Sequence, residues 1–275
     1  MRLNASLKPK KRSPFRIRLG KMYYTWKRYL HWYTGGNRYA RMRSQDMLPF
    51  VVFRHETPLY RKLKDVDMRL QRGKVANLSL AIGRLNGLLI QPGERFSYWR
   101  QIGRPSKRKG YQKGMVLFYG TFKEGIGGGL CQLSNLIYWM TLHTPLTIHE
   151  RYRHSYDVFP DSSRTQPFGS GATCAYNYLD LQIDNRVSSV YQLHLYLTDT
   201  HLVGEWRCSQ KPFYHFEVYE KEHRITAESW GGYVRHNRIH RYVYNLAGEI
   251  LDDEYVTENH ALMMYSPLLQ NREGQ

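Results

Sequence analysis

Three consecutive glycines lead into an apolar segment near the middle of the chain, and this junction constrains the fold more than any other feature. The run Gly127-Gly128-Gly129 is followed by Cys131 and by apolar residues at helical spacing as far as Leu142. Glycine accepts positive φ angles and lets the backbone approach another segment closely, so a tight turn is expected here. Because the following segment is apolar around most of its girth, it predicts a central buried helix that begins at Cys131.

The remaining patterns predict an α+β fold in which this helix packs on a mostly antiparallel sheet. Helices are expected over 17–32 and from Val75 towards Leu89, with Asn86-Gly87 as a stop signal. The turn Asn245 to Glu249 predicts a hairpin. Domain organisation is expected as a basic extension over 1–45, a core domain over 46–200 and a β-rich part over 201–275 that packs on the core. Strands are expected over 49–53, 146–154, 172–185 and 190–198, and as short segments over 213–220 and 233–244.

Positive charge is concentrated at the N-terminus. Residues 1–43 hold 13 of the 41 Lys and Arg residues and no acid, so the rest of the chain has 28 basic against 23 acidic residues. Aromatic side chains such as Tyr23, Trp26 and Trp32 alternate with the basic ones. This composition suits an anionic membrane surface, nucleic acid, or a solvated arm with a few core anchors.

Several classes of protein are disfavoured by the composition. No apolar run is long enough to span a bilayer, and no secretory signal is recognised, so a cytoplasmic location is expected. Three cysteines without a CxxC motif favour a reducing compartment over a disulfide framework. His236 and His240 lack the Glu of a zincin motif and lie in a segment that reads as strand, so neither a metal site nor a cofactor is expected.

The residue order around Cys131 indicates thiol chemistry. A helix start carries unpaired N–H groups and a partial positive charge, which lower the pKa of a thiol and favour the thiolate. His154 follows 23 residues later, so a cysteine at a helix start precedes a histidine as in papain-like thiol enzymes. Cys131 is then the candidate nucleophile, His154 its base, and the N–H groups from Gly129 to Gln132, with the Gln132 amide, an oxyanion hole.

Two motifs stand out in the middle of the chain: the run Asn86 to Ser97, with its Gln91-Pro92-Gly93-Glu94 turn, and the glycine–cysteine run Gly127 to Asn135. The first resembles the opening motif of the VanW family, and the second matches the glycine–cysteine motif of that family. Arg151 to His154, and Gly171-Ala172-Thr173 with Asp180-Leu181, resemble its later landmarks. The resemblance is dense over about 75–200.

The resemblance implies an association with glycopeptide resistance and the cell envelope, without an established reaction. With it, the Cys131 chemistry points to a cysteine-dependent amidase or transpeptidase that acts on a peptidoglycan-precursor peptide. Arg151 and Arg153 are candidates to hold a substrate carboxylate. The family commonly has Asp where this chain has Gly171, so Asp180 is the candidate third catalytic residue.

Asp157 and Asp161 are weaker candidates for that third position. Two other functions stay open. In the first, a non-catalytic binding or scaffold module, the glycine turn of residues 127–129 cradles an anion at the helix start and Cys131 merely packs, while residues 1–43 dock on the inner membrane face. The second, nucleic-acid binding, rests on the basic segment alone and lacks any recognised nucleic-acid motif, so no nucleic-acid partner is expected.

Overall fold

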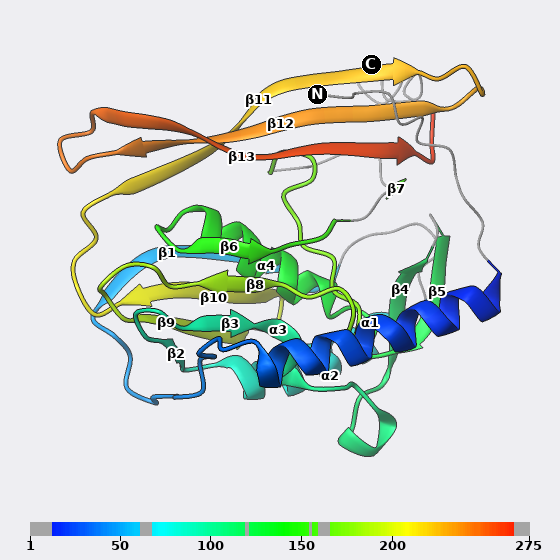
Figure 1. Cartoon of the computed structure of the whole chain (residues 1–275), viewed down its shortest axis with the longest axis horizontal. Helices are drawn as coiled ribbons and strands as arrows, with labels where there is room; N and C mark the ends of the chain where they lie inside the picture. The colour runs from blue at the N-terminus through cyan, green and yellow to red at the C-terminus, as the bar shows by residue number, and fades with distance from the viewer. Residues whose placement is uncertain (1–12, 61–67, 119–120, 154–155, 159–165, 267–275) are drawn as a thin grey trace.

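The computed structural model describes residues 13–60, 68–118, 121–153, 156–158 and 166–266, and its elements lie in layers (Figure 1). Long strands form one outer layer, a helix and short sheets fill the middle, and the remaining helices lie on the opposite side (Figure 1). The described helices are α1 (Pro14–Thr34), α2 (Met68–Leu85), α3 (Tyr98–Ile102) and α4 (Cys131–Leu142), with a 3₁₀ turn, η1, at Lys107–Lys109.

Three sheets build the middle layer. The first has the antiparallel order β1-β10-β9-β2 and contains β1 (Phe50–Pro58), β2 (Leu88–Ile90), β9 (Tyr191–Leu197) and β10 (His201–Cys208). The second has the order β3-β8-β6 and contains β3 (Arg95–Ser97), β6 (Thr147–Glu150) and β8 (Gln182–Asp184). Strands β4 (Lys113–Phe118) and β5 (Thr121–Ile126) form a hairpin.

The outer layer is a fourth sheet with the order β11-β12-β13-β7. It contains β7 (Tyr156–Asp157), β11 (His215–Ala227), β12 (Tyr233–Tyr244) and β13 (Ile250–Met263), and β7 alone pairs in parallel. The predicted hairpin turn joins β12 to β13 through a bond from the Asn245 N–H to the Glu249 carbonyl. The α+β class is confirmed, and His236 and His240 lie on strand β12 as expected.

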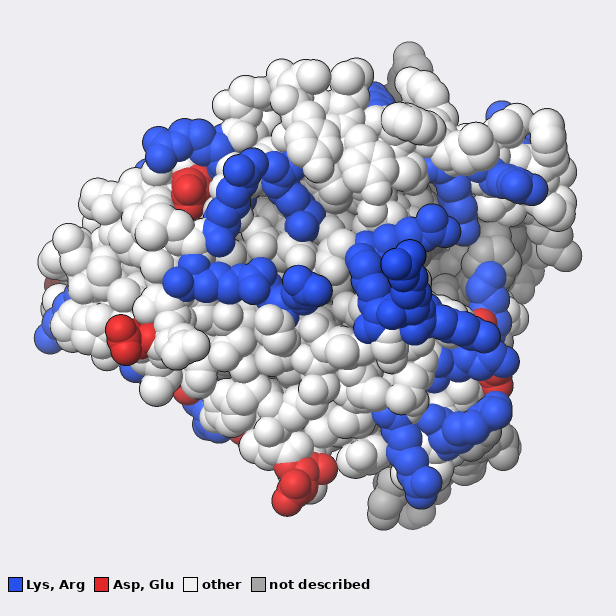
Figure 2. Space-filling view, turned by 90° about the horizontal axis from the view of Figure 1, so that it is seen from below, with Lys and Arg blue, Asp and Glu red and all other residues white. Residues whose placement is uncertain are grey.

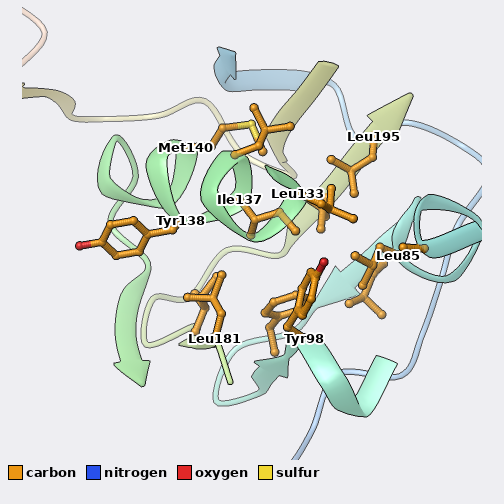
Figure 3. Close-up of a cluster of buried hydrophobic side chains, with 14 of the residues drawn as sticks. Leu85, Tyr98, Leu133, Ile137, Tyr138, Met140, Leu181 and Leu195 are labelled. Atoms are coloured by element: carbon orange, nitrogen blue, oxygen red, sulfur yellow. The ribbon is translucent and has the colours of Figure 1, made fainter. Parts of the chain in front are cut away.

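Helix α4 is the buried centre that the apolar run predicts. Leu133 and Ile137 are fully buried and lie among Tyr98, Leu181 and Leu195 from surrounding elements (Figure 3). On another side the helix packs against β1 and β10. Gly204 of β10 makes this approach possible, because a Cβ there would lie 2.7 Å from the Met140 methyl carbon.

Two local expectations are wrong. Leu89 continues the helical spacing of α2 but belongs to β2, since Gly87 takes φ +77° and ends the helix. The strand expected over 172–185 is reduced to β8, because α4 side chains bind the preceding backbone: Asn135 Oδ1 accepts from the Ala172 N–H at 2.8 Å and Ser134 donates to its carbonyl at 2.7 Å. Beyond residue 200, the segment expected over 233–244 is strand β12 with those bounds, while the one expected over 213–220 extends further and forms β11.

The described helices have no stretch long and apolar enough to cross a membrane. The expected helix over 17–32 is confirmed and extends to Pro14–Thr34. The expected boundary between the core domain (46–200) and the β-rich part (201–275) falls between β9 and β10. These two strands pair with each other, so one sheet continues across that boundary.

Candidate functional site

The three glycines form a turn that is held on every side by other backbone segments. Gly127 and Gly129 adopt φ values of +76° and +92°, which side chains disfavour. A Cβ on Gly128 would lie 2.6 Å from the Cα of Gly114, and one on Gly129 would lie 2.8 Å from the Cβ of Lys74. The glycines are therefore required for close packing against β4 and α2.

The N–H groups of the turn already have acceptors. Gly127 donates to the Gln112 carbonyl at 3.0 Å, Gly128 to Gly125 at 3.1 Å and Gly129 to Met115 at 3.0 Å. The Gln132 N–H donates to the Gly129 carbonyl at 3.0 Å. Because these donors are occupied, the Gly129 and Gln132 N–H groups of the expected oxyanion hole do not face an open site, and neither do the N–H groups of Gly127 and Gly128. The N–H groups of residues 130 and 131 have no acceptor among the described residues.

Asn77, which the sequence did not single out, joins α2 to this turn. Its amide nitrogen donates to the Gly128 carbonyl at 2.9 Å and to the Gln112 carbonyl at 3.1 Å, while its oxygen accepts from the Gln112 N–H at 2.8 Å. The residue is fully buried. An asparagine among the inward positions of an amphipathic helix is the sequence signal for such a role, because buried amides need partners.

The Cys131 thiol stands at the first turn of α4, as predicted, but its surroundings do not activate it. The residue is partly exposed, and its sulfur donates to the Cys174 carbonyl at 3.7 Å. Burial raises the pKa of the Cys131 thiol, the opposite of the expected direction. His154 lies outside the described residues, so its pairing with Cys131 stays a prediction.

Asp180 is buried and fully engaged. Its carboxylate accepts from the Ser97 hydroxyl at 2.6 Å and from the backbone N–H groups of Trp99 and Leu181, each at 3.0 Å. Burial raises the pKa of Asp180 to about 6, against the lowering effect of the bonds from Ser97 and Trp99. The carboxylate fixes the start of α3, and its role as a third catalytic residue stays a prediction. Of the two alternatives, Asp157 pairs with Arg235 at 3.2 Å, and Asp161 lies outside the described residues.

The expected substrate-binding side chains contact the protein itself. The Gln132 amide donates to the Thr57 hydroxyl at 2.9 Å and to the Pro58 carbonyl at 3.0 Å. Arg151 donates to the Gly171 carbonyl at 2.8 Å and also to Gly169, which ties the end of β6 to the loop over 166–171.

Among the expected substrate-binding side chains, Arg153 alone has a nitrogen without a hydrogen-bond partner among the described residues. Its Nη1 is buried and has no hydrogen-bond partner among the described residues, while its guanidinium lies 5.9 Å from the centre of the Phe168 ring. Burial and the neighbouring charge of Arg151 lower the pKa of Arg153 to about 10.

Gly171 fits its site because glycine has no side chain. A Cβ at this position would lie 2.7 Å from Oδ1 of Asn135, the atom that binds the Ala172 backbone. An aspartate here would have to displace Asn135 and break that bond. Glycine at this position leaves the bond between Asn135 and the Ala172 backbone undisturbed.

Helix α1 docks on the body through one narrow side. Arg28 forms two hydrogen bonds with the carboxylate of Glu150, one of them 2.6 Å long, and the hydroxyls of Tyr29 and Tyr176 lie 2.5 Å apart. Trp32 is buried near the end of the helix. Because these contacts hold one side of α1 against the body, they determine which of its other sides face solvent.

An adjoining side of α1 is an exposed apolar stripe. Its members follow one another at spacings of three and four residues, which places them on one helix face. They are between 48% and 74% exposed: Phe15, Leu19, Met22, Trp26, Leu30 and Tyr33. Exposed Arg16, Arg18 and Lys27 flank this stripe, which has no covering partner among the described residues.

Comparison with known proteins identifies the family. The family model described as VanW like protein matches residues 73–207. The Vancomycin B-type resistance protein VanW of Enterococcus faecalis (strain ATCC 700802 / V583) is 34% identical over 228 residues, which are 82% of each chain.

The chain belongs to the VanW family.

A second relative of this VanW family member is the Uncharacterized protein YoaR of Bacillus subtilis (strain 168). It is 29% identical over 110 residues, which are 40% of this chain and 35% of that protein. No solved structure matches the chain significantly. The family match contains the glycine turn, α4 and Asp180, whereas α1 and the long strands β11, β12 and β13 of the outer sheet lie outside it.

Proposed function

We propose that this VanW family protein is a peripheral binding module at an anionic membrane surface and serves there as an accessory protein in glycopeptide resistance. The apolar stripe of α1, exposed between basic side chains, is the observation that carries the membrane part. An interfacial helix buries such a stripe at the boundary between headgroups and acyl chains, while its Lys and Arg side chains meet the lipid phosphates. The resistance role is supported by the similarity to the Vancomycin B-type resistance protein VanW of Enterococcus faecalis.

The distribution of positive charge on the surface also supports a membrane contact on the side of α1. Figure 2 views the molecule from the side on which α1 and α2 lie in Figure 1, and Lys and Arg cover much of this face among scattered acids. Each basic residue close to an anionic leaflet contributes about 1 kcal/mol to binding. Hydrophobic and electrostatic attraction therefore act on one side of the molecule.

Flotation with lipid vesicles tests the membrane part. We expect binding to vesicles of phosphatidylcholine with phosphatidylglycerol, weakening with salt, and little binding to phosphatidylcholine alone. A double variant, Phe15→Ser with Trp26→Ser, is expected to bind at least about tenfold more weakly, since fully burying even one large apolar side chain is worth about 1.5–3 kcal/mol and about 1.4 kcal/mol corresponds to a factor of ten.

The matched control is Phe213→Ser with Leu246→Ser. These two residues are 66% and 69% exposed, similar to the 72% of Phe15 and Trp26, but lie in the turns that flank β11 and β12. The control is expected to bind vesicles like the unmodified protein. Equal binding of both double variants would contradict a specific role for the stripe of α1.

One observation favours a second function, thiol-dependent acyl transfer on a peptidoglycan-precursor peptide. The partly exposed Cys131 and the two N–H groups without acceptors at residues 130 and 131 suit an oxyanion intermediate. The raised pKa of the Cys131 thiol and the occupied carboxylate of Asp180 argue against it. Loss of resistance in a Cys131→Ala variant that folds normally and still binds vesicles would favour the acyl-transfer function.

A further inference from the structure

A small cationic pocket lies directly after α1, where the chain leaves the helix. Its volume is about 210 Å³, below the about 300–1,000 Å³ that is usual for drug-sized ligands, so it suits a small charged group. It is lined by residues from three segments: Asn37, Arg38, Gly93, Arg95, Asp184, Asn185 and Arg186. Three arginines and one acid give this lining a net positive charge.

The acid in the pocket is already neutralised. Arg95 donates to both oxygens of Asp184, from Nε at 2.6 Å and from Nη2 at 3.0 Å. His149 lies 3.6 Å from Oδ2 of the same carboxylate. Burial pushes the pKa of Asp184 upward, but the bonds and charge of Arg95 lower it overall. Asp184 therefore stays ionised and paired most closely with Arg95. Its single charge cannot balance the other two arginines, of which Arg186 shares the carboxylate at 3.4 Å.

Arg38 and Arg186 are these two arginines. Arg186 is 65% exposed and approaches Asp184 only at 3.4 Å. Arg38 is exposed, and no described residue forms a hydrogen bond or ion pair with its guanidinium. Two planar forks that converge on one pocket from different segments match the oxygens of a phosphate group.

The backbone around the pocket is braced. The Arg95 N–H donates to the Arg38 carbonyl at 2.8 Å, and Gly93 donates to the Asn185 carbonyl at 2.8 Å. The Asn185 amide nitrogen donates to the Ile90 carbonyl at 2.8 Å. Because the three segments are tied together, binding an anion would order only the two arginine side chains, which favours affinity.

We propose that this pocket binds the phosphate of an anionic phospholipid headgroup through Arg38 and Arg186. The proposal rests on the membrane role of α1. Tyr33, the last residue of the exposed stripe, precedes Asn37 by four residues, so pocket and stripe lie within about 14 Å of each other. A lipid next to the stripe can therefore place its headgroup in the pocket while its acyl chains contact α1.

A charge-preserving variant separates this pocket from general electrostatic attraction. Arg38→Lys with Arg186→Lys keeps both charges but removes the two forks. We expect it to bind phosphatidylglycerol-containing vesicles about tenfold more weakly than the unmodified protein. The matched control Arg16→Lys with Arg18→Lys, on exposed positions of α1, is expected to stay within about twofold.

Calorimetric titration with glycerol phosphate in the absence of lipid tests the pocket by itself. Binding that disappears in Arg38→Lys with Arg186→Lys, but not in the α1 control, is expected. Vesicle binding that depends on the stripe and not on these two arginines would overturn the pocket and leave the membrane role standing. Glycerol phosphate binding without any vesicle binding would overturn both the lipid assignment and the membrane role, leaving a site for a soluble phosphate.

Discussion

Substitution of Gly128 by alanine tests whether the glycine turn is required for close packing against β4 and α2. The added Cβ would stand 2.6 Å from the Cα of Gly114 and closer still to its carbonyl group. Both neighbours are backbone, so neither can rotate away, and β4 has to separate from the turn. That movement pulls the Gly128 carbonyl from Asn77 and the Gly129 N–H from Met115.

The expected loss of stability follows from these contacts. Two hydrogen bonds are worth about 1 kcal/mol each, and forcing extra volume into a packed interior costs about 1–3 kcal/mol. Together they give about 3–5 kcal/mol. Urea unfolding followed by circular dichroism measures the change as a lower midpoint at an unchanged slope.

Gly83→Ala is the matched control for the same chemical change. Gly83 lies within α2, and a Cβ there would meet nothing within 4 Å. Because alanine favours a helix interior, this variant is expected to gain about 0.5–1 kcal/mol. If Gly128→Ala unfolds at the same urea concentration as the unmodified protein, close packing does not explain the glycine turn.

Three further predictions concern the thiol, a buried acid and the docking of α1. Iodoacetamide should modify Cys131 at neutral pH more slowly than a free thiol, because burial raises its pKa; rapid labelling below pH 7, followed by mass spectrometry, would contradict this. Asp180 has a folded-state pKa of about 6, above its ordinary value of 3.8. Its contribution to stability should therefore be present below pH 4 and be lost as pH rises through 6. Thermal unfolding of Asp180→Asn, which cannot ionise at this position, should not show this loss. Arg28→Met should leave Glu150 unpaired and loosen α1, which trypsin would then release faster from Arg28→Met than from the exposed-site control Lys27→Met.

Local patterns predicted much of the fold. The apolar run after Cys131, the alternation of basic and aromatic residues before Trp32 and the turn at Asn245 all lie where expected, because helix periodicity and turn chemistry act over a few residues. Leu89 was misassigned because one apolar residue fits both a helix face and a strand. Its place was decided by Gly87 and by pairing with β9.

The candidate site was less predictable, since its chemistry depends on distant partners. A helix start predicts a lowered thiol pKa, but burial in the folded chain raises the pKa of Cys131, against the lowering effect of its bond to the Cys174 carbonyl 43 residues away. The position of Asp180 in a motif predicts a third catalytic residue. Its bond with the Ser97 hydroxyl, 83 residues earlier in the chain, could not be predicted from that motif.

The amino-acid sequence by itself determined the main helices, the β12–β13 turn, the segregation of positive charge and membership of the VanW family, because these depend on short-range periodicity and on the identity of successive residues. Only the tertiary structure decided which N–H groups lack an acceptor among the described residues, which carboxylates are paired, and that the apolar stripe of α1 is exposed. These properties depend on which remote segments exclude water from a group or supply its hydrogen-bond partners, and no local pattern contains that information.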